Sequence, residues 1–219
     1  MANSAPSPTK AHQSARSALR VVDDVLGYMK DTQGKPAKKE RALFASAIVF
    51  TYGIWENYVE LLAIELAQKV SEKIPPERVP EGIRRLLEKG SAWELAVSPG
   101  WRRLWVQRVK LQAIGDDVEK YGLNTAKAGQ VRSLLQLAGV QDAFAGLDVS
   151  MVPAHLSGTI KEVCDALNDL VELRGQIVHT GRVPDSLRKN HVREWRQFVE
   201  SIVAKLDSNC RKECDQLLT

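Results

Sequence analysis

The spacing of apolar residues between Ala37 and Lys73 constrains the fold more than any other feature of the chain. Apolar side chains recur there in steps of three and four residues, at Leu43, Ala47, Phe50, Ile54, Tyr58, Leu62, Leu66 and Val70. Such steps place the side chains on one face of an α-helix, which predicts one long helix with a buried stripe. No stretch of the sequence shows the two-residue alternation of a half-buried strand. We therefore expect an all-α protein.

Three further long helices are predicted around this one, at residues 12–30, 154–180 and about 186–217. Asp185 or Ser186 is suited to cap the last of them. The apolar stripe of that last helix is Val192, Trp195, Val199, Ile202 and Leu206. Because short loops favour antiparallel neighbours, the sequence predicts an up-and-down helical bundle.

The middle of the chain, at residues 75–150, is less regular. A proline-rich hinge opens it, and glycines separate short predicted helices at 80–90, 101–114 and 125–138. A chain of 219 residues suits one well-packed domain. We therefore expect residues 12–219 to form a single domain, in which residues 75–150 are an insertion of short helices.

Nothing in the sequence indicates export or membrane insertion. Residues 1–11 are rich in Ser, Pro and Ala, which predicts a disordered tail without the apolar core of a signal peptide. The longest apolar run, at 42–54, is interrupted by polar residues and is too short to span a bilayer. Three cysteines, an odd number without a Cys-x-x-Cys pair, argue against a disulfide framework. No His or Cys lies near enough to complete a metal site with Cys210 and Cys214, so we expect these and Cys164 to be ordinary thiols of a cytoplasmic protein.

The apolar face of the predicted helix at 154–180 has one break. Its buried positions, in steps of three and four residues, are Leu156, Ile160, Val163, Leu167, Leu170, Arg174 and Ile177. Arg174 thus stands where the pattern requires an apolar side chain. Burying a guanidinium is costly unless it meets an acid, a phosphate or a subunit boundary. Two structural roles stay open: the stem could lie over the core with its head in water, or the head could pair with a carboxylate such as Glu56.

His179 lies near the end of the same helix, which Gly181 is suited to terminate. It follows Arg174 by five residues, about 140° around the helix and about 7.5 Å along it, so one helix does not aim both side chains at one point. Gly175 lies beneath His179 and leaves room for a close approach. A second copy of the helix across a two-fold axis would bring two Arg–His pairs into one cleft. A lone histidine at a helix end is also often a capping or surface residue.

Arginine and histidine are the side chains needed to cleave RNA without a metal ion. Histidine transfers protons near neutral pH, and arginine binds phosphate oxygens. A base activates the ribose 2′-hydroxyl, which attacks the adjacent phosphorus while cations stabilise the charge on the phosphoryl oxygens. The sequence has no phosphate-binding glycine loop, Gly-x-Ser-x-Gly elbow or cluster of zinc ligands. His12 and His155 have no convincing partners in the sequence.

Two segments resemble a known family. The stretch from Asn168 to Gly181, which contains Arg174, four residues and then His179, resembles the signature of the HEPN superfamily near the end of a long helix. The stretch Phe50-Thr51-Tyr52-Gly53-Ile54-Trp55-Glu56-Asn57-Tyr58-Val59-Glu60 is similar to the first long helix of the RiboL-PSP-HEPN branch. The family usually has a polar residue, commonly Asn, directly after the Arg, and this chain has Gly175 there.

The resemblance implies a HEPN-like helical bundle that dimerises and cuts RNA at a shared cleft, often as a toxin or antiviral effector. Arg174 and His179 carry over as the catalytic residues, and Glu56 and Gly175 are supporting candidates. It implies no cofactor and no metal, with RNA as substrate, a homodimer, and an antitoxin or other regulatory partner.

RNA would also need a basic surface, and the chain has a net charge of +4. One group of candidate RNA-binding residues follows the Arg–His pair and another lies in the middle of the chain: Arg182, Arg188, Lys189 and Arg193, then Arg102 and Arg103. Trp101 and Trp105 accompany the second group, and exposed aromatic rings stack on unpaired bases, although tryptophans at helical spacing are usually core residues.

Three functions follow from these residues. The first is a metal-independent endoribonuclease in which Arg174 clamps phosphate and His179 is acid, base or both. The second is a catalytically inactive module of the same fold that binds RNA or a nucleotide, an alternative that Gly175 keeps open. The third is a helical partner-binding protein in which Arg174 is structural.

Overall fold

A computed structural model describes residues 7–29, 36–116, 122–123, 125–160 and 162–219. These residues form α-helices and short 3-10 helices, without a strand among them. In chain order the elements are α1 (Lys10–Gly27), α2 (Lys38–Lys73), η1 (Pro76–Arg78), α3 (Glu81–Leu86), α4 (Ala92–Val97), α5 (Trp101–Ile114), α6 (Ala128–Leu137), η2 (Val149–Met151), η3 (Ala154–Leu156), α7 (Val163–Thr180) and α8 (Lys189–Leu218). The predicted all-α helical bundle is confirmed.

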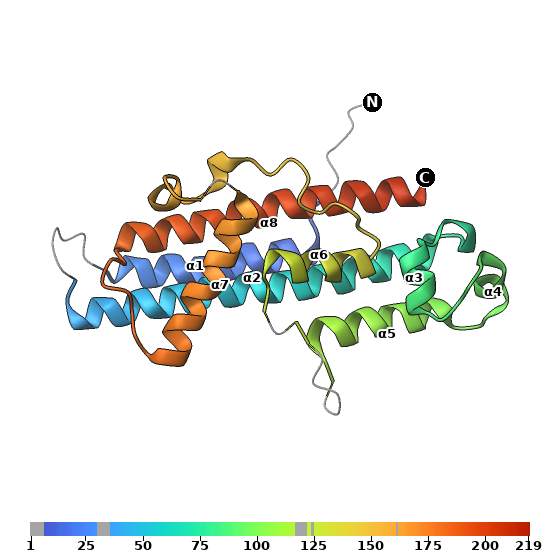
Figure 1. Ribbon diagram of the computed structural model, residues 1–219, viewed down its shortest axis with the longest axis horizontal. Helices are drawn as coiled ribbons and strands as arrows, with labels where there is room; N and C mark the ends of the chain where they lie inside the picture. Colours follow the sequence, from blue (N-terminus) through green and yellow to red (C-terminus); the bar gives the residue numbers. More distant parts are fainter. Residues whose placement is uncertain (1–6, 30–35, 117–121, 124, 161) are drawn as a thin grey trace.

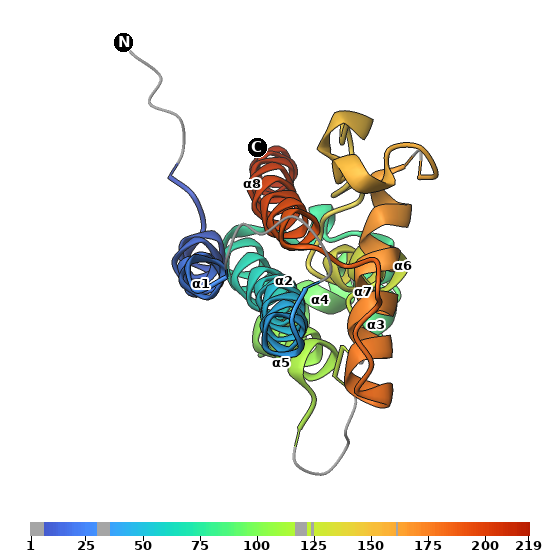
Figure 2. The same cartoon turned by 90° about the vertical axis from the view of Figure 1, so that its left-hand side faces the viewer.

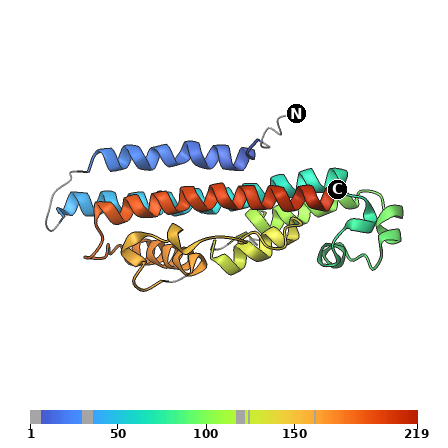
Figure 3. The ribbon, with the colours of Figure 1, turned by 90° about the horizontal axis from the view of Figure 1, so that it is seen from above.

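Three long helices, α1, α2 and α8, lie side by side along the length of the molecule (Figures 1 and 3). α2 and α8 run in the same direction and α1 runs opposite to both. α5 and α6 pack on the C-terminal half of α2, and α3 and α4 lie at that end of the molecule. α7 runs across the long helices, as the end-on view in Figure 2 shows. α2 is therefore the central helix, in contact with α1, α5, α6, α7 and α8.

The apolar spacing explains most of the core. The predicted stripe of α8 is buried along its whole length, and α1 buries Ala11, Ala15, Leu19, Val22 and Leu26 in the same three- and four-residue steps. The predicted stripe of α2 was wrong at Phe50, which is 53% exposed. α2 has neighbours on several sides, so it also buries residues outside that stripe, among them Tyr52 and Trp55.

Some helix ends differ from the prediction. α7 begins at Val163 rather than at residue 154, because residues 154–156 form η3 and Gly158 follows in a turn. Neither Asp185 nor Ser186 caps α8, whose N-cap residue is Arg188. Gly181 ends α7 in the left-handed conformation, φ +64°, as predicted.

The remaining differences lie in the N-terminal half of the chain. α4, which was not predicted, is capped by Ser91, whose Oγ accepts a hydrogen bond from the Glu94 backbone N. α1 begins at Lys10 and ends at Gly27, rather than at residues 12 and 30. Residues 1–6 of the predicted tail and residues 31–35 of the predicted loop lie outside the described residues.

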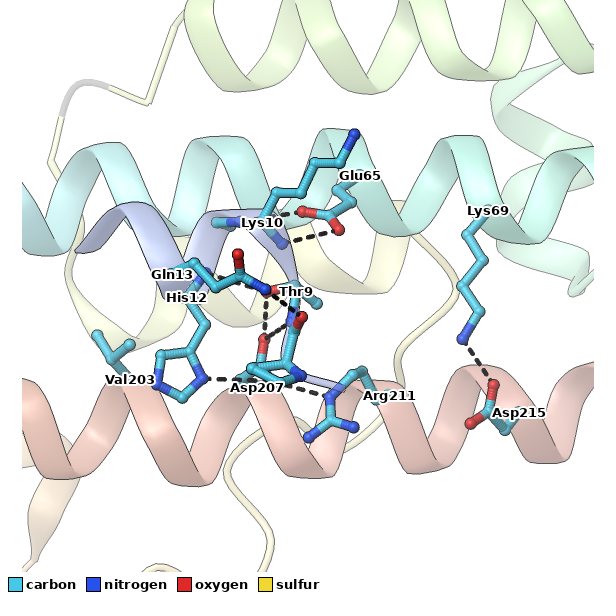
Figure 4. A network of polar contacts seen from close by, with 12 residues as sticks. Thr9, Lys10, His12, Gln13, Glu65, Lys69, Val203, Asp207, Arg211 and Asp215 are labelled. Atoms are coloured by element: carbon cyan, nitrogen blue, oxygen red, sulfur yellow. Dashed lines mark hydrogen bonds and ion pairs between the residues drawn. The ribbon is translucent and has the colours of Figure 1, made fainter. Parts of the chain in front are cut away.

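A buried polar network fixes the N-terminus of α1 on α8 (Figure 4). The carboxylate of Asp207, which is fully buried, accepts hydrogen bonds from the Thr9 backbone N at 3.3 Å, the Thr9 hydroxyl, and Arg211 Nε at 2.8 Å. His12 Nδ1, for which no partner was predicted, lies 3.5 Å from Asp207 Oδ2, within ion-pair range but without forming a hydrogen bond. From α2, Glu65 accepts hydrogen bonds from the first two backbone N–H groups of α1, both at 3.0 Å. The first turn of α1 is thus held by both neighbouring helices.

Within the described residues, no helix combines the length and the apolar character required to cross a membrane. Cys164, Cys210 and Cys214 are free thiols, and the last two are fully buried in the core. Burial, with nearby acidic groups, raises the pKa of the Cys210 thiol far above its ordinary value.

Candidate functional site

α7 holds Arg174 on the face that packs against the bundle. Val163, Leu167, Leu170 and Ile177 of the predicted seam are buried, and Arg174 is half-buried among them. The Arg174 guanidinium carbon lies 5.0 Å from the centre of the Tyr52 ring of α2, a cation–π distance. Its Nε is buried and has no hydrogen-bond partner in the described part of the chain. The guanidinium is thus held by an aromatic face, and part of its hydrogen-bonding capacity is unused.

Tyr52 links Arg174 to Glu56. The Tyr52 hydroxyl donates to Glu56 Oε1 at 2.5 Å and accepts from the Ala126 backbone N at 3.1 Å. Burial and the Glu56 carboxylate raise the pKa of Tyr52 well above its usual range, so the phenol stays protonated. Glu56 forms no ion pair with Arg174 among the described residues. Glu56 is therefore linked to Arg174 indirectly: it accepts a hydrogen bond from Tyr52, and the Tyr52 ring contacts the Arg174 guanidinium.

A second carboxyl group lies one helical turn beyond Glu56. Burial, and then the charge of Glu56, raise the pKa of Glu60 from 4.5 to about 7. Sequence reasoning did not single out Glu60, since its raised pKa depends on neighbours that the helical pattern does not specify. Near neutral pH, only part of the population therefore carries a proton on Glu60.

Glu60 should make the protein less stable as the pH rises. In the unfolded chain the carboxyl loses its proton near pH 4.5, whereas the folded protein retains it to about pH 7. Between these values the folded state binds more protons, so the free energy of unfolding falls with increasing pH. Thermal melts should show a larger fall in Tm between pH 5 and pH 8 for the wild type than for Glu60→Gln. Glu72→Gln, an exposed position on the same helix, is the control; equal falls in all three proteins would contradict the assignment.

His179 lies in the last turn of α7 and is exposed. It forms no hydrogen bond with any described residue. Among the described residues, a Cβ atom added at Gly175 would meet the His179 ring alone, with Cδ2 at 4.0 Å. The surface around this pair is therefore open. Arg174 and His179 face different directions from one helix, so a single protomer does not bring them together.

The predicted RNA-binding residues differ in their surroundings. Arg182, Arg188 and Arg103 are exposed. Of these, Arg188 Nη1 also donates to the carbonyls of Asp185 at 2.5 Å and Leu187 at 3.0 Å. The remaining three also make contacts within the protein: Lys189 Nζ donates to the Met29 carbonyl at 2.6 Å, Arg193 Nη1 to Asn190 Oδ1 at 2.9 Å, and Arg102 Nη2 to the Ile74 carbonyl at 2.8 Å. Trp101 and Trp105 are core residues and present no face to a base.

His155 has partners that its sequence position did not indicate. Its Nδ1 lies 2.5 Å from Glu194 Oε2, and its ring stacks on that of His191 with 4.3 Å between centroids. His155 precedes α7 and the other two residues lie on α8, so the cluster forms only when the chain folds. The i, i+3 spacing of His191 and Glu194 on one helix face was the only signal in the sequence.

A comparison with known protein families gives a match to about half of the chain. Residues 108–211 match the family model described as RiboL-PSP-HEPN. The match includes all of α6 and α7, with Arg174 and His179, and does not include α1 or α2. No match was found among curated proteins or among solved structures.

Proposed function

We propose that this chain, whose RiboL-PSP-HEPN domain at residues 108–211 places it in the HEPN superfamily, is an endoribonuclease that cuts RNA without a metal ion. One observation carries the proposal: α7 presents a half-buried arginine, whose Nε has no hydrogen-bond partner among the described residues, and an exposed histidine that forms no hydrogen bond with any of them. An unpaired buried N–H requires an acceptor, and a phosphate oxygen is an acceptor that also neutralises the charge.

The two residues have separate roles in the reaction. His179 removes the proton from the ribose 2′-hydroxyl, whose oxygen then attacks the adjacent phosphorus. The bond from phosphorus to the 5′-oxygen breaks, and that oxygen takes a proton from a histidine. Arg174 donates hydrogen bonds to the phosphoryl oxygens as negative charge builds on them. The products are a 2′,3′-cyclic phosphate and a 5′-hydroxyl end.

A dimer would complete this site. Arg174 and His179 point in different directions from one α7, so the cleft needs a second copy of the helix across a two-fold axis. The open surface at Gly175 leaves room for that approach. In this arrangement Glu56 acts through Tyr52 to position Arg174. The exposed Arg182 and Arg188 provide cations beside the cleft.

Among the described residues, no three His, Cys, Asp or Glu side chains are grouped so that they could hold a metal ion. The family resemblance supports a role as a toxin or antiviral effector, with an antitoxin or other regulatory partner that holds the activity in check.

The purified protein should cleave total RNA or tRNA in the presence of EDTA. The fragments should end in 2′,3′-cyclic phosphate, and a single 2′-deoxy substitution at the cut nucleotide should prevent cleavage, because the nucleophile is then missing. Cleavage that EDTA stops, or fragments with 3′-hydroxyl ends, would contradict the mechanism. A folded protein that binds RNA but cleaves none of it would instead favour the inactive binding module.

A further inference from the structure

A cavity of about 310 Å³ opens between α7, α8 and the segment that carries His155. This volume lies at the small end of the range for ligand pockets, about 300–1,000 Å³. The side chains that give the cavity its chemistry are His155, Asp169, Glu172, Gln176, His191 and Trp195. None of them belongs to the Arg174–Tyr52–Glu56 cluster described above.

Three ring side chains, His155, His191 and Trp195, are among the residues that line the cavity. The rings of His155 and His191 are stacked, with only 10° between their planes, and Trp195 meets His155 edge-on with 5.6 Å between centroids. Glu194 fixes the orientation of His155 by accepting from its backbone N at 3.0 Å and contacting its Nδ1 at 2.5 Å. Ring side chains of this kind stack on unpaired bases.

The α7 wall is polar, with Asp169, Glu172 and Gln176 in steps of three and four residues along one face. Burial, and then the charge of Glu172, raise the pKa of Asp169. Trp195 is 1% exposed, and its Nε1–H has no hydrogen-bond partner in the described part of the chain.

We propose that this cavity binds one unpaired nucleobase of the RNA substrate, an inference that rests on the proposed ribonuclease function. A nucleobase has a flat face for the ring side chains and an edge of donors and acceptors for Asp169 and Gln176. The carboxylates repel phosphate, so the RNA backbone stays outside. The nearest exposed cation in the sequence is Arg188, which directly follows Leu187, a residue that lines the cavity.

Two residues that line the cavity, Glu172 and Gln176, precede His179 on α7. Glu172 and His179 are seven residues apart on α7, which places them within about 20° of each other around the helix and about 10.5 Å apart along it. Gln176 lies between them, about 4.5 Å from His179 along the axis. A nucleotide whose base occupies the cavity therefore directs its sugar and phosphate toward His179. The cavity selects which nucleotide is presented for cleavage.

The test measures binding by the full-length protein of four RNA pentamers, of A, C, G or U, with 2′-O-methyl riboses that cannot be cleaved. One pentamer should bind at least about tenfold more tightly than the weakest, and Asp169→Asn should reduce that preference to about threefold or less. Asp165→Asn removes the same charge from the same helix at an exposed position outside the cavity, and it should leave the preference unchanged.

A second measurement needs no variant. The ring-proton NMR signals of His155 and His191 in the wild type should shift when the preferred pentamer is added, whereas the weakest pentamer should leave them in place. Equal binding of all four pentamers, or a preference unaffected by Asp169→Asn, would overturn the proposal. So would equally tight binding of the free nucleoside, since the cavity would then be a site for a small nucleoside and not for a base within RNA. Because the 2′-O-methyl pentamers cannot be cut, these binding results do not depend on catalysis. If the protein cleaves ordinary RNA but binds the four pentamers equally, the proposal for the cavity is rejected and the ribonuclease function is not.

Discussion

A mixture of Arg174→Ala and His179→Ala proteins should recover RNA cleavage that neither variant has alone. Each substitution should lower the cleavage rate by about 10²–10⁴-fold, because one removes the proton acceptor and the other the phosphate clamp. If each site takes its arginine from one protomer and its histidine from the other, a mixed dimer contains one complete site of two. With random exchange of protomers, half of the dimers are mixed, and each mixed dimer has half of its sites complete. The mixture should therefore recover about one quarter of the wild-type rate.

Two controls make this result specific. Mixing Arg174→Ala with the double variant should recover nothing, because no dimer then contains a complete pair. Arg16→Ala, at an exposed position on α1, should cleave like the wild type. Circular dichroism should show that Arg174→Ala stays folded, since this side chain makes no ion pair among the described residues and lies over one ring. Active single variants would disprove the catalytic roles, and inactive single variants without recovery would disprove the shared site.

Asp207→Ala should cause the largest loss of stability. The fully buried carboxylate accepts hydrogen bonds from both the backbone N and the hydroxyl of Thr9 and from Arg211 Nε, and its removal leaves these donors buried without their acceptor. Breaking a buried charge pair in this way costs about 3–5 kcal/mol. For a chain of this length, that loss should lower Tm by about 6–20 °C, which calorimetry would measure.

Asp215→Ala is the matched control for this prediction. Asp215 also lies on α8 and pairs with Lys69 at 2.7 Å, but its side chain is 49% exposed. Water screens such a pair, so the loss should stay below about 1 kcal/mol. Equal losses from the two substitutions would show that the Asp207 network does not hold α1 in place.

The sequence predicted those parts of the fold that depend on one helix at a time. Apolar steps of three and four residues identified the buried stripe of α8 and the unusual position of Arg174 in α7. Gly181 was predicted as the end of α7 because a left-handed residue there favours glycine. Phe50 was misplaced because an amphipathic pattern predicts one buried face, whereas α2 packs against helices on several sides.

Short elements and long-range pairs were harder to predict. α4 has a capping signal, Ser91 followed three residues later by Glu94, but its six residues are too few for periodicity to show. The contact of His155 with His191 spans 36 positions, and that of Tyr52 with Ala126 spans 74. Such pairs depend on how the helices cross, which no single helical pattern contains. The predicted roles of Arg174 and His179 likewise depend on a second protomer.

The bond between Thr9 and Asp207 joins positions 198 residues apart, and this separation has a consequence for synthesis. On the ribosome, α1 and α2 emerge first, and the α8 residue that fixes α1 is synthesised 198 residues after Thr9. Until then the nascent chain exposes apolar side chains such as Leu19 and Val22, which become fully buried only in the finished bundle. Chaperones therefore have a long interval in which to bind this protein. If the protein cleaves RNA, a site that needs the complete bundle cannot form beside the translating ribosome before α8 has been synthesised.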